Sequence, residues 1–360
     1  DASEEPEPTA SAEPGAASTA VAEEAPAAAP ITDAARRTLI PPSRSFPAVI
    51  KVVGVGGAGT YTLSGGALGV TGDLRIASGT LAASGNAVTV GGSWLNVGGV
   101  FTHGNASVTL TGSGDIMTGA SAFDTVTVNG DGTYTLNDDL TADTILEVTG
   151  GVITPTTDLD ELTVTGDMTL DGGAFTGTEK DFVMTGALTV SATGSFTAGT
   201  GTFEIAGASG SYTEANVDEG QTVWTDGTLY IRSDLDQTLP GGETYNNLYL
   251  DDHTGGATTY TLGSGSGTAI TGDWHIYDGV IVELAEDTTV GGDLVIDGAL
   301  YTNGFELTVA GSTDVNGTLD ATSDGEDGGA SPSVLTLGSD LDFTGGAFVR
   351  DDSTIIFNGS

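Results

Sequence analysis

The chain has no cysteine among its 360 residues, which excludes disulfides, thiolate nucleophiles and cysteine-ligated zinc or iron–sulfur sites. It also has few cations, because 8 Lys and Arg residues stand against 50 Asp and Glu, giving a formal net charge of −42. A surface of that sign repels nucleic acid and anionic membranes. No run of 18 apolar residues occurs, so the sequence predicts no transmembrane segment.

The N-terminal segment lacks any apolar periodicity. Residues 1–47 consist mainly of Ala, Pro, Glu and Ser, a composition typical of a disordered acidic tether. The segment has neither a basic start nor a continuous apolar stretch, so it does not match a signal peptide. We therefore expect two regions, a disordered tether over residues 1–47 and a folded repeat array over residues 48–360.

From residue 48 onward, short runs of Val, Thr, Leu and Ile alternate with Gly, Asp and Asn, which indicates strands and turns. One apolar-x-Gly-x-apolar motif recurs along these runs, at Val70–Ile76, Val90–Trp94, Val164–Leu170, Ile270–Ile276 and Val290–Ile296. Its glycines are spaced 19 or 20 residues apart within three groups, at 72, 92 and 112, at 166 and 186, and at 272, 292 and 311. A period near twenty residues predicts the coils of a solenoid.

A coil of about twenty residues accommodates three short strands and three turns, and each strand stacks on the next coil at about 4.8 Å. We therefore expect an all-β fold, a right-handed parallel β-helix of about 15 coils. Val, Leu, Ile and Phe should point inward, Thr and Asp outward, and glycine should occupy corners with positive φ. A tandem of β-sandwiches is the alternative, because a TYTL motif also recurs after 73 residues, from Thr60 to Thr133.

A longer repeat unit is marked by TYTL at Thr60–Leu63, Thr133–Leu136 and Thr259–Leu262, with aromatic-led strands at Phe123–Val128 and Tyr245–Leu250. The last residues, Ser353–Ser360, match Ser107–Ser113, which leads into such a strand, so we expect the array to be truncated at its C-terminal end. In this order of motifs the chain resembles the secreted and surface-exposed β-helix repeat proteins of bacteria and archaea, the filamentous-haemagglutinin or adhesin-like group.

The resemblance implies a non-enzymatic, extracellular or cell-surface stalk or adhesin-like module. Its expected partners are surface glycans, other cell-surface proteins or extracellular matrix. The resemblance implies no catalytic residue and no cofactor.

A glycine loop at Ile50–Gly59 is similar to the nucleotide loop of the tubulin-like cell-division GTPases. That loop needs a helix directly after it, because the helix N-terminus holds the phosphate. Here the strand-like Thr60–Leu63 follows, so we interpret the glycines as a turn between strands.

Paired carboxylates support an alternative function, a carbohydrate-active or carbohydrate-binding β-helix domain that uses surface carboxylates with calcium. The pairs are Asp138 with Asp139, Asp251 with Asp252, and Asp351 with Asp352. An enzyme of this kind would be a polysaccharide hydrolase or lyase, and a hydrolase needs two carboxyl groups that face the same sugar. Adjacent residues of a strand point to opposite faces, so a dipeptide alone makes no such pair.

Calcium is the ligand that this acidic surface favours, because hard cations need several oxygen ligands. The weak candidates are Asp324, Glu326 and Asp327, with a second loop at Asn129–Asp131. His103, His253 and His275 are not at metal-ligand spacing, and His275 should point outward from its strand. Trp94 and Trp274 occupy repeat positions held elsewhere by Leu or Met, so we expect them in the core.

Overall fold

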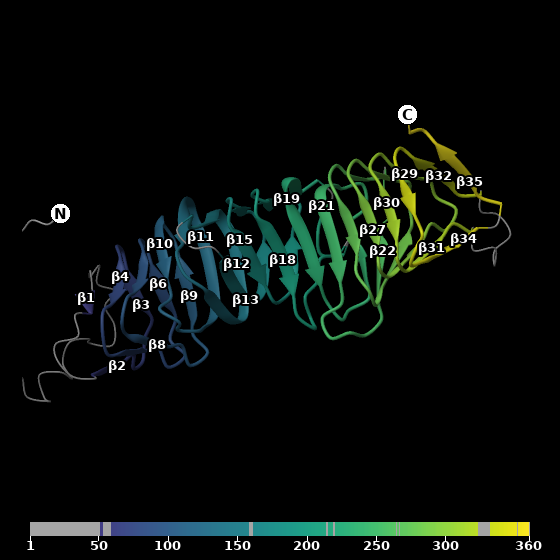
Figure 1. Ribbon diagram of the computed structural model, residues 1–360. Coiled ribbons are helices and arrows are strands. Elements are labelled where there is room, and N and C mark those ends of the chain that lie inside the picture. The colour runs from purple at the N-terminus through teal and green to yellow at the C-terminus, as the bar shows by residue number, and fades with distance from the viewer. Residues whose placement is uncertain are drawn as a thin grey trace, which may run out of the picture. The chain divides into compact units, whose positions relative to one another are not determined.

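The computed structural model of the chain describes residues 51–52, 59–157, 161–213, 215–218, 220–263, 265, 267–322, 332–350 and 352–359. They belong to one compact unit, Ser45–Ser360. The described residues form strands and no helix, and the strands stack in parallel as a β-solenoid of about 14 coils, about 20 residues apart (Figure 1). The predicted parallel solenoid is confirmed. The sandwich alternative is wrong, because the strand pairs are parallel throughout the described part. The predicted tether, residues 1–47, lies outside the described residues.

Each coil has three sides, which the first complete coil illustrates. Side one is β3 (Leu68–Val70), side two is β4 (Leu74–Ile76) and side three is β5 (Thr80–Ala82). The next coil repeats them as β6 (Val88–Val90), β7 (Trp94–Asn96) and β8 (Val100–Thr102), paired in register with the first three. A side is therefore a column of strands contributed by successive coils.

Flanking and later strands extend these columns. In the N-terminal part they are β1 (Lys51–Val52), β2 (Thr60–Thr62), β9 (Ser107–Leu110), β10 (Gly114–Met117), β11 (Phe123–Leu136), β12 (Leu140–Pro155), β13 (Glu161–Leu170), β14 (Ala174–Thr176), β15 (Asp181–Met184), β16 (Leu188–Val190), β17 (Ser195–Thr197) and β18 (Thr202–Ala206). In the C-terminal part they are β19 (Thr222–Arg232), β20 (Gln237–Leu239), β21 (Thr244–Asp251), β22 (Thr258–Leu262), β23 (Thr268–Ile270), β24 (Trp274–Ile276), β25 (Val280–Leu284), β26 (Thr288–Val290), β27 (Leu294–Ile296), β28 (Ala299–Tyr301), β29 (Leu307–Val309), β30 (Thr313–Val315), β31 (Thr318–Asp320), β32 (Val334–Leu337), β33 (Leu341–Asp342), β34 (Ala347–Val349) and β35 (Thr354–Phe357).

The core runs along the inside of the stack and follows the alternation of the strands. In β6, Val88 and Val90 are buried and Thr89 between them is half-buried. Trp94 and Trp274 are buried, as predicted from their repeat positions. Contacts between large aromatic rings stabilise the fold beyond what the burial of their apolar area contributes. Apolar burial therefore holds successive coils together from within.

The periodic glycines do not all have the predicted positive φ. Gly92, Gly186 and Gly292 do not have positive φ. A Cβ atom there would lie within 3.0 Å of the preceding coil's corner, against its glycine backbone and its Asp carboxylate. These glycines are required because stacked corners approach too closely for a side chain. Positive φ, the predicted role, occurs at the periodic Gly166 and at the next corner along the coil, at Gly79 and Gly279.

The same corner motif lies on different corners of the solenoid along the chain. Asp73 lies between side one and side two, at the end of β3 and the start of β4. The column of β4 continues through β7, β10, β11, β12, β14, β17, β19 and β21 to β23. Asp273 follows β23, so its corner lies between side two and side three. The repeat unit is therefore not a whole number of coils.

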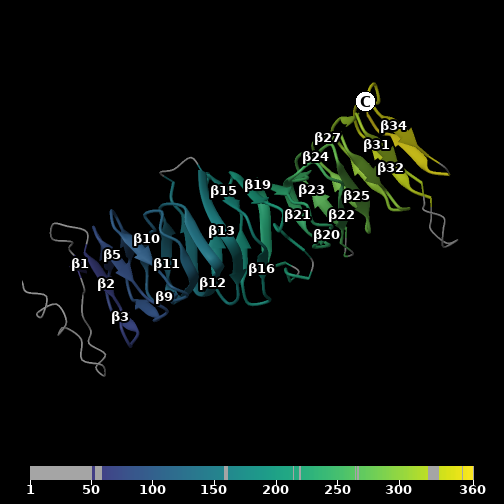
Figure 2. The same ribbon diagram turned by 90° about the horizontal axis from the view of Figure 1, so that it is seen from below.

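One coil interrupts the column of side one. After β16, the described residues between Gly207 and Gln221 make only isolated bridges to this strand and its start, Ala187 with Ser211 and Val190 with Val217. The next strand on this side, β20, begins a separate six-stranded sheet with β22, β25, β28, β31 and β34. Figure 2 shows β20, β22 and β25 side by side. The solenoid thus consists of an N-terminal array, through β18, and a C-terminal array, from β19 onward.

Buried polar groups close this junction between the two arrays. The Gln237 side chain accepts a hydrogen bond from the Tyr212 N–H at 2.9 Å, where a neighbouring strand would otherwise accept it. Trp224 Nε1 donates to the Tyr212 hydroxyl at 3.0 Å. Burial raises the pKa of Tyr212 and of Tyr245, so both hydroxyls stay protonated in the folded chain.

Candidate functional site

Corner carboxylates connect one coil to the next. Asp73 Oδ1 accepts a hydrogen bond from the Ser93 backbone N–H at 2.8 Å. Asp167 accepts one from Ala187 at 2.8 Å, and Asp273 accepts one from Asp293 at 2.9 Å. Each bond joins an ionised acceptor to a backbone donor, which makes it stronger than a neutral hydrogen bond. Part of the large negative charge therefore serves to hold stacked corners together.

The paired aspartates are engaged in similar bonds rather than facing one another across an open site. Asp138 accepts hydrogen bonds from the backbone of Thr118 at 2.6 Å and Gly119 at 2.8 Å, in the preceding coil. Asp139 accepts one from Thr163 at 2.8 Å, in the following coil. The two carboxylates, in the turn between β11 and β12, thus bond to opposite neighbouring coils.

The second and third pairs differ from the first. Asp251 accepts a hydrogen bond from the Tyr230 hydroxyl at 2.6 Å. Asp252 is buried and accepts one from the Gly255 backbone at 2.6 Å. Asp351 lies outside the described residues, so the third pair remains untested.

The calcium candidates Asp324, Glu326 and Asp327 also lie outside the described residues. Within the part of the chain that the structure describes, no group of three or more His, Asp or Glu side chains is arranged to hold a metal ion. Asp131, from the second predicted loop, is exposed. The prediction of a calcium site therefore remains untested.

The three histidines lie apart. His103 Nε2 is 3.3 Å from Asp143, and the backbone of His253 donates to Asp234 at 3.2 Å. His275 projects from the outer face of β24 between the buried Trp274 and Ile276, as predicted.

An outward cluster of side chains surrounds His275. Tyr230, Tyr249 and His275 are in register on β19, β21 and β24, three strands of successive coils (Figure 2). Tyr277, two residues beyond His275, stacks on its ring with the centroids 3.8 Å apart. We call these four half-buried residues the tyrosine–histidine flank.

Charged groups border the flank. His275 Nε2 is 2.7 Å from Asp297 Oδ2, and the side chain of Asn316 donates to Asp297 Oδ1 at 2.9 Å. Partial burial opposes ionisation of Asp297, but the hydrogen bonds from His275 and Asn316 outweigh it and lower the pKa of this carboxyl. Arg232 pairs with Glu204 at 2.7 Å on the opposite border.

Sequence reasoning placed His275 outward but missed the flank as a unit. The sequence held one signal for the flank, the alternation of inward and outward residues in two segments. In Tyr245–Leu250 this alternation puts Tyr249 on the outer face, and in the segment around His275 it puts the histidine there. Only the coil register brings these separate segments together.

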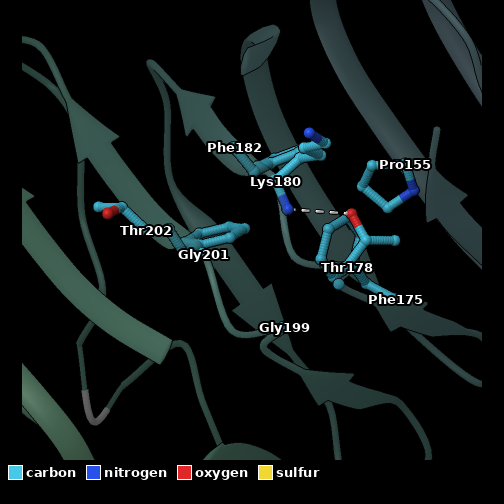
Figure 3. Close-up of a pocket in the computed structure, with 10 residues that line it drawn as sticks. Pro155, Phe175, Thr178, Lys180, Phe182, Gly199, Gly201 and Thr202 are labelled. Atoms are coloured by element: carbon cyan, nitrogen blue, oxygen red, sulfur yellow. Dashed lines mark hydrogen bonds between the residues drawn. The ribbon is translucent and has the colours of Figure 1, made fainter. Parts of the chain in front are cut away.

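A small depression lies at a corner of the N-terminal array (Figure 3). Its lining includes Phe175, Phe182 and Phe203 and also Thr178, whose hydroxyl accepts a hydrogen bond from the Lys180 backbone at 3.4 Å. The free space is about 10 Å³, the size of one water molecule. It is too small to hold a sugar ring or a cofactor.

Comparisons with known proteins found no matching family model, no similar curated protein and no similar solved structure. Over the described residues, no helix of sufficient length and apolarity to cross a membrane is present.

Proposed function

We propose that the chain is a non-enzymatic structural module of an extracellular or cell-surface protein, a solenoid stalk that carries binding surfaces or further domains. The observation that supports this proposal is the repeated corner bond, in which a carboxylate accepts the backbone N–H of the next coil. It recurs at Asp73, Asp167, Asp273 and Asp293. Bonds of this kind act between coils and so oppose separation of the stack under load.

A pulling experiment tests this proposal. The chain is held at both ends in an optical trap and unfolded, beside a variant with Asp73→Ala, Asp167→Ala and Asp273→Ala together. We expect coils to unfold in steps, at forces clearly higher for the native chain than for the variant. Equal unfolding forces would contradict a load-bearing role of the corner bonds.

Catalysis is tested separately with soluble polysaccharides. The stalk function predicts that no reducing ends are released, with or without calcium. Release that disappears in an Asp138→Asn, Asp139→Asn variant would replace the structural proposal with the enzymatic alternative.

A further inference from the structure

The flank gathers outward aromatic rings that contact one another, whereas Tyr61 and Tyr301 lie outside it. Tyr134, Tyr212, Tyr245 and Tyr260 are buried in the solenoid. Tyr230, Tyr249 and Tyr277 instead project outward within one small area, beside His275. Half-exposed aromatic side chains that gather on one face of a strongly charged protein need an explanation beyond core packing.

The rings of the flank form an uneven row across three coils. The ring centroids of Tyr230 and Tyr249 are 6.4 Å apart, and those of Tyr249 and His275 are 6.0 Å apart. The ring planes are nearly perpendicular, at 74° and 79°. Ring faces therefore alternate with ring edges, at a spacing comparable with the length of one pyranose unit. Such a row presents both apolar faces for sugar C–H groups and polar edges for sugar hydroxyls.

Of the three tyrosine hydroxyls of the flank, one makes a hydrogen bond within the described part of the protein. Tyr230 donates to Asp251. Within the described residues, no hydrogen bond is made by the hydroxyl of Tyr249 or of Tyr277, and neither of these side chains is fully buried. These two hydroxyls can therefore exchange hydrogen bonds with a ligand. Asp251 and Asp297 are already fixed by protein donors, so they offer acceptors in set positions.

The charge of the chain restricts the ligand. A formal net charge of −42 repels polyuronates and sulfated glycans, and the carboxylates bordering the flank add to this locally. A neutral polysaccharide carries no such penalty, and its hydroxyls can donate to Asp251 and Asp297 while its C–H faces contact the tyrosine rings. We propose that the tyrosine–histidine flank binds a neutral glycan chain lying across β19, β21 and β24. This inference is independent of the stalk function, because a stalk needs no ligand.

Affinity electrophoresis tests the inference directly. The intact chain is run through native gels that contain a neutral glucan, mannan, xylan or galactan, and through gels with polygalacturonate or alginate. We expect retardation by at least one neutral polysaccharide and none by the two polyuronates. Retardation by no neutral member, or equal retardation by the polyuronates, overturns the inference.

Three variants locate the site on the retarding polysaccharide. Tyr249→Ala should weaken binding by about tenfold, because it removes one contact ring. Tyr249→Phe keeps the ring and should stay within about threefold of the native chain. Tyr301→Ala is the matched control, because Tyr301 is half-exposed but lies on β28, outside the flank. Equal losses for Tyr249→Ala and Tyr301→Ala would overturn the assignment, and circular dichroism of each variant checks that its fold is retained.

Discussion

The corners at Asp73 and Asp273 are built from the same motif, Thr-Gly-Asp between two apolar strands, yet they lie on different corners of the solenoid. In both, the Asp carboxylate accepts a backbone N–H from the next coil, at 2.8 Å and at 2.9 Å. In both, a glycine of the next coil packs directly against that carboxylate. The difference in position shows that the motif specifies the local geometry of a corner, but not which of the solenoid's corners it forms. Three nearly equivalent sides let it serve at any of them.

The junction between the two arrays can be compared with the interior of one array through their buried tryptophans. Trp224 at their junction contacts Phe196 of the N-terminal array, with the ring centroids 4.7 Å apart, and Tyr245 of the C-terminal array, at 6.4 Å. Trp274 lies entirely within the C-terminal array, paired between Leu248 and Leu294. Trp224 therefore continues the aromatic core past the interrupted column, beside the strand ladder that joins β18 to β19.

The largest effect is expected from Trp224→Ala. The substitution should cost about 3–5 kcal/mol and divide urea unfolding into two transitions, because it removes the largest buried side chain that packs between the arrays. Circular dichroism and tryptophan fluorescence would follow the unfolding. Trp274→Ala is the control, because it should lower the free energy of unfolding by a similar amount but leave a single unfolding transition. A single coincident transition for Trp224→Ala would show that the arrays are coupled by other contacts.

Glycine substitutions compare the two corners directly. Gly92→Ala and Gly292→Ala should each destabilise the chain by about 1–3 kcal/mol, because the added methyl group meets the corner beneath it. Gly69→Ala is the control, since a Cβ atom there has nothing within 4 Å. Denaturant midpoints measure all three. If only one of the two substitutions lowers the denaturant midpoint, the two corners are not equivalent.

Removal of the corner carboxylates should have a smaller effect. Asp73→Ala and Asp273→Ala should each cost about 1 kcal/mol, because one charge-assisted hydrogen bond is lost at an exposed or half-buried position. Asp131→Ala, at an exposed position, should leave stability unchanged. Thermal unfolding compares the variants. An equal loss for Asp131→Ala would mean that the effect comes from general charge rather than from the corner bond.

The smallest effect concerns the flank and depends on pH. Because the pKa of Asp297 is lowered in the folded chain, its ionised form stabilises the fold above the ordinary aspartate pKa. This contribution is lost as pH falls through the lowered value. Asp297→Asn should therefore be less stable than the native chain by under about 1 kcal/mol at neutral pH, with the difference vanishing in acid. Urea unfolding at several pH values measures it, and a difference independent of pH would contradict this explanation.

The solenoid was predictable from the sequence because Val70–Ile76 and its repeats encode both a strand alternation and a twenty-residue step. The inward positions of Trp94 and Trp274 followed from the same repeats. The role of Gly92 and Gly292 was not predictable, since one chain segment does not reveal how closely the next coil approaches. The flank was missed for a related reason. Tyr230, Tyr249 and His275 meet only through the coil register, and the step of 26 residues from Tyr249 to His275 departs from the twenty-residue period.

The interchangeable sides have a consequence for how such a chain can grow. A gene duplication that adds one strand and one corner, rather than a complete coil, advances every later residue by one side and leaves the sequence of each strand and corner unchanged. Successive duplications of unequal length can therefore distribute copies of one loop around the circumference. The array gains new surfaces by rotation of old segments, before any residue in them has mutated.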